Sequence, residues 1–128
     1  MTATTDMRVE MDDAMRERPD LLRAAEVASD FLDEFVGQYA DTFGEDRVMT
    51  WRYDPRHPDG ERVWVSYSEH DDLGERAVQQ WFPPKDLFDS VSRRSRMRDL
   101  LHGVLAQWWK QSDARTAAYF RALDEAGE

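Results

Sequence analysis

The sequence predicts a small α+β domain in which helices form one layer and an antiparallel sheet forms the other. Apolar residues recur at steps of three and four in residues 19–43 and again in residues 97–123, which is typical of amphipathic helices. Between them, residues 47–82 are rich in β-branched and aromatic residues, which favour strands. Two amphipathic helices on one face of a sheet bury their apolar sides in a two-layer domain. A chain of 128 residues fits one such domain, which we expect to span residues 19–128.

The first predicted helix starts at Pro19, a residue suited to the first helical position, and Gly44 is its expected stop. Its apolar positions share one face: Leu22, Ala25, Phe31, Leu32, Phe35, Val36, Tyr39 and Phe43. Residues 1–18 are polar and acidic, and methionines recur in them only patchily, at positions 7, 11 and 15. We expect residues 1–18 to form a mobile acidic arm.

The other face of this helix carries more negative charge than helix stability requires. This acidic ridge consists of Glu26, Asp30, Asp33, Glu34 and Asp41. Residues 1–46 hold 13 Asp or Glu against 4 Arg, whereas residues 93–128 hold 5 against 7 Lys or Arg, within a chain of net charge -10. Such a ridge suits a basic partner.

Three strands are expected in the middle of the chain. Residues 47–54 and 61–68 flank the turn sequence PRHPDG and predict a hairpin. Pairing Tyr53 with Val63, Trp51 with Val65 and Met49 with Tyr67 puts all six on one face, toward the helices. A third strand, 75–82, follows the acidic loop EHDDLG and ends at two prolines, which completes a three-stranded meander.

The opposite face of this meander is the predicted interaction surface. It carries two tryptophans among polar neighbours: Arg52, Trp64, Ser66, Gln79 and Trp81. If both long helices cover the other face, these indoles stay open to solvent. An uncovered face of this kind indicates a homodimer or a protein partner.

After the prolines, KDLFDSV predicts a short helix, and a long C-terminal helix follows to about residue 125. Its apolar positions are Met97, Leu100, Leu101, Val104, Leu105, Trp108, Ser112, Tyr119 and Leu123. Trp108 and Trp109 are adjacent, so they point about 100° apart and only one can sit centrally in the buried stripe.

Four arginines crowd the start of that helix: Arg93, Arg94, Arg96 and Arg98. A helix start carries partial positive charge, so arginines there oppose the helix dipole and serve another purpose. One hypothesis is that they pair with the acidic ridge within the molecule. The alternatives are that they bind an external carboxylate or phosphate, or that they are simply solvated.

Several classes of protein are disfavoured. The chain has no cysteine, no signal-peptide pattern and no apolar run of the roughly 20 residues that span a bilayer, so we expect a cytoplasmic protein. His57, His70 and His102 have no nucleophile arranged beside them, and the segment 69–72 lacks the spacing of a known metal motif. The glycines are isolated, so no phosphate-binding loop is predicted. We expect no cofactor, no metal and no enzymatic activity.

The sequence therefore predicts a protein-interaction module, such as a small acidic adaptor, chaperone or inhibitor-like protein, that self-associates. One alternative is a small-molecule or anion-binding protein or enzyme with a pocket between sheet and helices, using Tyr53, Tyr67, His102 and the arginines of 93–98. Another is a nucleic-acid-associated protein that uses the same arginines, which the net charge of -10 and the pI near 4.7 disfavour. The preference for arginine, with only Lys85 and Lys110 as lysines, suggests a GC-rich bacterial or phage genome.

Overall fold

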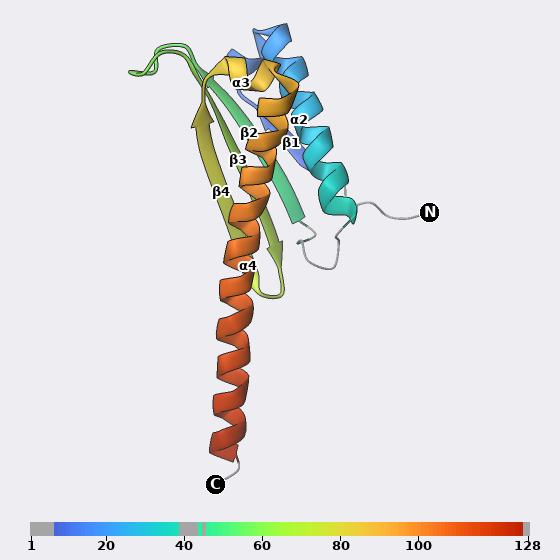
Figure 1. The fold of residues 1–128 in the computed structure, drawn as a ribbon, viewed down its shortest axis with the longest axis vertical. Helices are drawn as coiled ribbons and strands as arrows, with labels where there is room; N and C mark the ends of the chain where they lie inside the picture. The colour runs from blue at the N-terminus through green and yellow to red at the C-terminus, as the bar shows by residue number, and fades with distance from the viewer. Residues whose placement is uncertain (1–6, 39–43, 45, 127–128) are drawn as a thin grey trace.

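The computed structural model describes residues 7–38, 44 and 46–126 and shows two layers (Figure 1). One layer is a sheet with strand order β1-β2-β3-β4, and the other holds the helices α2, α3 and the first half of α4. The elements, in chain order, are β1 (Arg8–Met11), α1 (Asp13–Arg16), α2 (Pro19–Gln38), β2 (Asp46–Asp54), β3 (Arg62–Asp71), β4 (Gly74–Phe82), α3 (Pro84–Phe88) and α4 (Ser90–Ala126). The mixed α/β, two-layer architecture is as predicted.

The sheet has four strands, so the prediction of a three-stranded meander is wrong in one respect. The additional strand, β1, pairs in parallel with β2, with Arg8 opposite Val48 and Met11 opposite Trp51. A parallel pair needs a crossover connection, and α1 and α2 supply it. Residues 7–18, assigned from the sequence to a mobile arm, thus contribute a strand and a helical turn, with Met7 and Met15 in the core. Residues 1–6 lie outside the described residues.

Helix α2 packs on the sheet through a side made mostly of small residues. Its buried positions are Leu21, Ala24, Ala25, Ala28, Ser29, Leu32 and Val36. The alanines let the helix backbone approach the sheet closely, and the Ser29 hydroxyl accepts a hydrogen bond of 2.9 Å from the buried indole Nε1 of Trp51. A buried indole N–H needs such a partner. The predicted continuation of this helix past Gln38 lies outside the described residues.

The β2–β3 hairpin has the predicted register: Tyr53 pairs with Val63, Trp51 with Val65 and Met49 with Tyr67. The acidic loop predicted between the second and third strands is wrong, because β3 continues to Asp71 and β4 starts at Gly74. Only two residues join these strands, and Gly74 has a φ of +121°, which glycine adopts at little cost.

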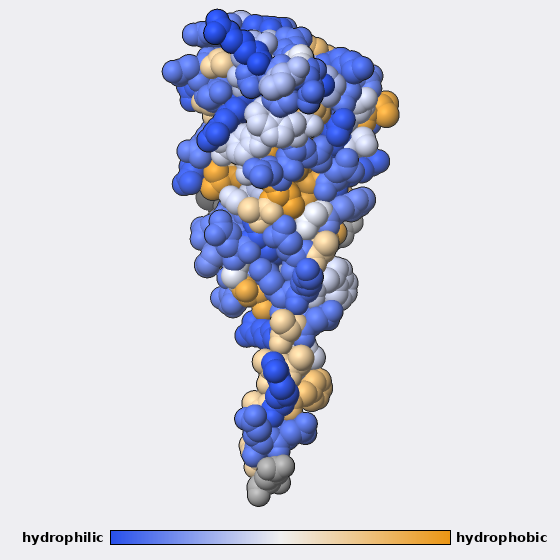
Figure 2. All heavy atoms as spheres, turned by 90° about the vertical axis from the view of Figure 1, so that its left-hand side faces the viewer, coloured by the Kyte–Doolittle hydropathy of each residue, from blue (hydrophilic) through white to orange (hydrophobic). Residues whose placement is uncertain are grey.

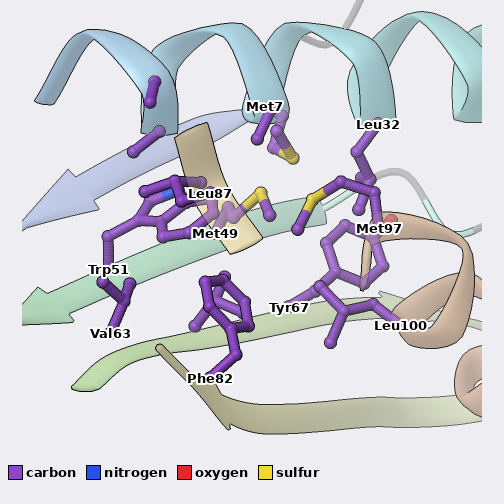
Figure 3. Close-up of a cluster of buried hydrophobic side chains, with 14 of the residues drawn as sticks. Met7, Leu32, Met49, Trp51, Val63, Tyr67, Phe82, Leu87, Met97 and Leu100 are labelled. Atoms are coloured by element: carbon purple, nitrogen blue, oxygen red, sulfur yellow. The ribbon is translucent and has the colours of Figure 1, made fainter. Parts of the chain in front are cut away.

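The core fills the space between the sheet and the helices (Figure 3). Helix α4 contributes Met97, Leu100, Leu101 and Val104 from its first half. Gly103 brings α4 against β4 so closely that a Cβ there would lie 2.6 Å from Cγ1 of Val78. From Asp113 to Ala126 every residue is exposed, and α4 projects past the end of the sheet (Figure 1). The two long helices share one face of the sheet as predicted, but only half of α4 takes part.

Candidate functional site

Four side chains form a continuous row on the sheet face opposite the helical layer of the described structure. Trp64 of β3 lies opposite both Trp81 of β4 and Arg52 of β2, so strand register places the three side by side. The Trp64 and Trp81 ring centroids are 6.3 Å apart, and the Arg52 guanidinium carbon lies 4.7 Å from the Trp64 ring centroid. The His57 ring, from the hairpin turn, lies 5.0 Å from that of Trp81. We call Arg52, Trp64, Trp81 and His57 the aromatic array.

The aromatic array is ordered by its own contacts yet open to solvent. Trp81 is 48% exposed, Arg52 is exposed and Trp64 is half-buried between them. An arginine stacked on an indole gains from cation–π attraction, and its N–H groups remain free to bind a carboxylate. The array therefore combines an ordered apolar surface with a cation. Tryptophan and arginine are among the residue types enriched at the centres of protein interfaces.

A shallow depression occupies the same region of β3 and β4. It has a volume of about 260 Å³ and is lined by Ser66, Ala77, Val78 and Gln79. Ser66 pairs with Gln79, two residues along the strands from the tryptophan pair. The small side chains of Ser66 and Ala77 leave this depression next to the large indoles of Trp64 and Trp81.

The acidic ridge lies in the other layer, on α2. Glu26, Asp30 and Glu34 are exposed, whereas Asp33 accepts a 2.9 Å bond from Arg47. Asp41 lies outside the described residues. Because α2 covers the opposite face of the sheet from the aromatic array, the ridge and the array belong to two separate surfaces (Figure 1).

The arginine cluster connects α4 to α3, not to the acidic ridge. Arg96 forms an ion pair of 2.7 Å with Asp86, donates to Gln80 and lies over the Phe82 ring. Arg93 donates to the carbonyl oxygen of Leu87 at 3.0 Å, which satisfies a group at the end of α3. Arg94 and Arg98 are exposed. Two of the four candidate anion-binding arginines are therefore engaged in internal contacts.

The residues proposed for a pocket between sheet and helices are not brought together. Tyr67 is fully buried, where the loss of hydration raises the pKa of its phenol, whereas His102 is exposed on α4. The Tyr53 hydroxyl donates to Glu61 at 2.5 Å and accepts from Arg18 at 3.2 Å. Hydrophobic side chains occupy the space between the layers in the described part of the chain.

A buried ionic network, not predicted from the sequence, fixes the turn between β3 and β4. Arg76 and Glu69 are both fully buried, 3.4 Å apart, and Arg76 also contacts Asp71 at 2.6 Å and Gln111 of α4 at 2.9 Å. The backbone N–H of Gly44 donates to Glu69. Burial raises the pKa of Glu69, and the bond from Arg76 lowers that of Asp71. Glu69 and Asp71, two of the four residues of the segment 69–72, therefore have a structural role.

The free edge of β4 is closed by glutamines of α4. Gln107 donates to the carbonyl oxygen of Ala77 at 2.7 Å and accepts from its N–H at 3.0 Å. Gln111 donates to the carbonyl oxygen of Glu75 at 3.1 Å. A side-chain amide thus replaces the backbone of a neighbouring strand, so this stretch of edge is not open to strand addition.

No protein-family model, curated protein or solved structure matches the chain. Within residues 7–38, 44 and 46–126, none of the helices combines the length and the apolar composition needed to cross a membrane.

Proposed function

We propose that this protein is a non-enzymatic interaction module that binds a protein partner through the uncovered face of its sheet. The observation that carries the proposal is the aromatic array, with Trp81 48% exposed beside a stacked, exposed Arg52. Isolated exposed apolar residues are ordinary on protein surfaces, but two adjacent indoles on one row of a sheet form a contiguous patch.

The chemistry of the array indicates which kind of partner surface we expect. An apolar side chain would pack against the indoles, and a neighbouring carboxylate would pair with the Arg52 guanidinium, which already lies on Trp64 and so loses little freedom on binding. The expected partner surface therefore presents an apolar residue next to Asp or Glu. Of the roles considered, an adaptor fits best, because the acidic ridge of α2 offers a second surface, in the opposite layer, for a basic partner.

Site-specific photo-crosslinking tests this proposal. A photoreactive amino acid in place of Gln79, beside the array, should capture a partner in cells of the source organism, whereas the same group in place of Glu26 on α2 should not capture that protein. The purified partner is then titrated against wild type and against Trp64→Ser combined with Trp81→Ser. We expect the double variant to weaken binding by about 30-fold or more, because buried tryptophans dominate interface energetics.

Phe88→Ser is the matched control, since this aromatic side chain is 45% exposed but lies on α3, in the helical layer and away from the array. It should leave the affinity for that partner unchanged. Equal binding by wild type and the double variant would refute the proposal. So would salt-dependent binding of single-stranded nucleic acid that requires the array, which would favour the nucleic-acid alternative instead.

The sequence also predicts self-association. Binding of a protein partner through the aromatic array does not require it.

A further inference from the structure

The second half of α4 is an amphipathic helix that no other part of the described residues covers. Residues 113–126 are all exposed, and at about 1.5 Å per residue they extend roughly 20 Å. Along this projection, apolar side chains appear among hydrophilic ones (Figure 2). A helical segment of this length is only marginally stable in water by itself, and it persists here as the continuation of a packed helix.

The apolar side chains of this segment lie on one side of the helix. Trp109, Tyr119, Phe120 and Leu123 are 61%, 61%, 58% and 50% exposed. Ser112 and Thr116 lie between them at the same three- and four-residue spacing, while charged residues and alanines occupy the remainder of the helix. We call these six residues the α4 stripe. It continues the side of α4 on which Leu105 packs against the core.

We propose that the α4 stripe is the interface of a symmetric dimer in which α4 of a second copy packs against it in antiparallel orientation. Charge supports a second copy as the occupant. Residues 105–126 hold three basic residues (Lys110, Arg115, Arg121) and three acidic ones (Asp113, Asp124, Glu125), so this segment is neutral within a chain of net charge -10. The projecting residues 113–126 extend roughly 20 Å, which exceeds the Debye length of about 8 Å at physiological salt. Pairing through this projection therefore keeps most of the acidic surface of one copy screened from the other.

The shape of the stripe supports the antiparallel orientation. Its bulky residues lie at the two ends, and small Ser112 and Thr116 lie in the middle. A two-fold axis at Thr116 sets Trp109 opposite Leu123 of the second copy and Ser112 opposite Phe120, so that large side chains meet smaller ones. Both copies then use the same residues, as a closed two-fold interface requires.

The area that the stripe can bury corresponds to a weak, reversible dimer. An aromatic side chain buries roughly 150–250 Å² when fully enclosed, and the three aromatics of the stripe still expose about 60% of their surface. Together with Leu123, each copy would bury about 400–500 Å². The total of about 800–1,000 Å² is below the roughly 1,200–2,000 Å² of stable interfaces and corresponds to weak, reversible association.

Sedimentation equilibrium on the full-length protein at several concentrations tests the dimer. Wild type should be a dimer, and Phe120→Glu should raise its dissociation constant by about 100-fold or more, because the charge would be buried against apolar side chains. Ala118→Glu, which adds the same charge two residues away on the other side of the helix, is the matched control and should dimerise like wild type. Circular dichroism should show equal helix content in both variants.

Disulfide trapping tests the orientation, and the absence of native cysteines makes it clean. Thr116→Cys places one thiol at the two-fold axis and should give a covalent dimer on oxidation, whereas Ala114→Cys, on the opposite side of the helix, should not. A monomer at all concentrations would overturn the proposal. So would a dimer that Phe120→Glu leaves intact, one that Trp64→Ser with Trp81→Ser dissociates, or one in which Thr116→Cys fails to crosslink.

Discussion

Arg76 is the residue on which the β3–β4 turn depends. A buried guanidinium is costly unless its N–H groups are bonded, and Glu69, Asp71 and Gln111 together bond it from β3 and α4. The same cation acts differently on its two acidic partners. It holds the pKa of Asp71 below its usual value, whereas burial outweighs it at Glu69 and raises that pKa.

Asp71→Asn should make stability less dependent on pH. A carboxyl whose pKa is lowered in the folded state stabilises the fold above its unfolded pKa of about 3.9, and that contribution is lost as pH falls through the folded value. Urea unfolding should therefore show Asp71→Asn about 1–3 kcal/mol less stable than wild type at pH 7, with the difference shrinking below about pH 4.

Asp72→Asn is the control for this measurement, because Asp72 is an exposed neighbour in the same turn. It should change the free energy of unfolding by less than about 0.5 kcal/mol. A difference between wild type and Asp71→Asn that stays constant from pH 7 to pH 3 would show that Asp71 does not act through its charge.

At the scale of elements, α4 does two jobs: it covers part of the core and it closes the edge of β4. Gln107 bonds both backbone groups of Ala77, as a neighbouring strand would. An open edge allows pairing with another chain, so this contact protects β4 from strand addition. To make these contacts, α4 runs alongside β4, and the second half of α4 therefore extends beyond the sheet.

Gln107→Ala should open that edge. We expect faster hydrogen exchange at the Ala77 amide and a loss of about 1 kcal/mol in the free energy of unfolding, since two partly exposed hydrogen bonds are removed. Lys110→Ala, on an exposed side of the same helix, should change neither. Unchanged exchange at Ala77 in Gln107→Ala would contradict the edge-closing role.

The sequence predicts the elements whose patterns are strong and local. The hairpin register follows from alternation at Met49, Trp51 and Tyr53, and the opposite face of the same strands carries Trp64 and Trp81. Strand β1 was not predicted, because its alternation of charged and apolar residues spans only four positions and its pairing with β2 depends on a distant segment. Periodicity also extends along all of α4 and does not reveal where its tertiary contacts stop.

Part of the site chemistry was open to prediction. Glu69 and Arg76 are equidistant from the two-residue turn, so a tight hairpin would have paired them across the strands. The contacts of Arg93 and Arg96 with α3 could not be predicted from the sequence. The charge pattern shows which groups could pair, but it does not show where a five-residue helix lies.

At the scale of the whole molecule, the two faces of the sheet differ in how they are covered. The buried Trp51 lies on the face that the helical layer covers, while Trp64 and Trp81 lie on the other face, in contact with each other, Arg52 and His57. The projecting half of α4 adds a second exposed apolar surface. The two proposed interfaces correspond to these two exposed apolar surfaces, the outer face of the sheet and the projecting half of α4.

The most direct test is ¹⁹F NMR of the protein labelled with fluorotryptophan, assigned by single Trp→Phe variants and recorded with a soluble paramagnetic agent at a concentration where the protein is monomeric. Trp81 and Trp109 should be broadened strongly, Trp64 partly and Trp51 hardly at all, following their exposure. If Trp64 and Trp81 were as protected as Trp51, the sheet would be covered on both faces and the proposed docking surface would not exist.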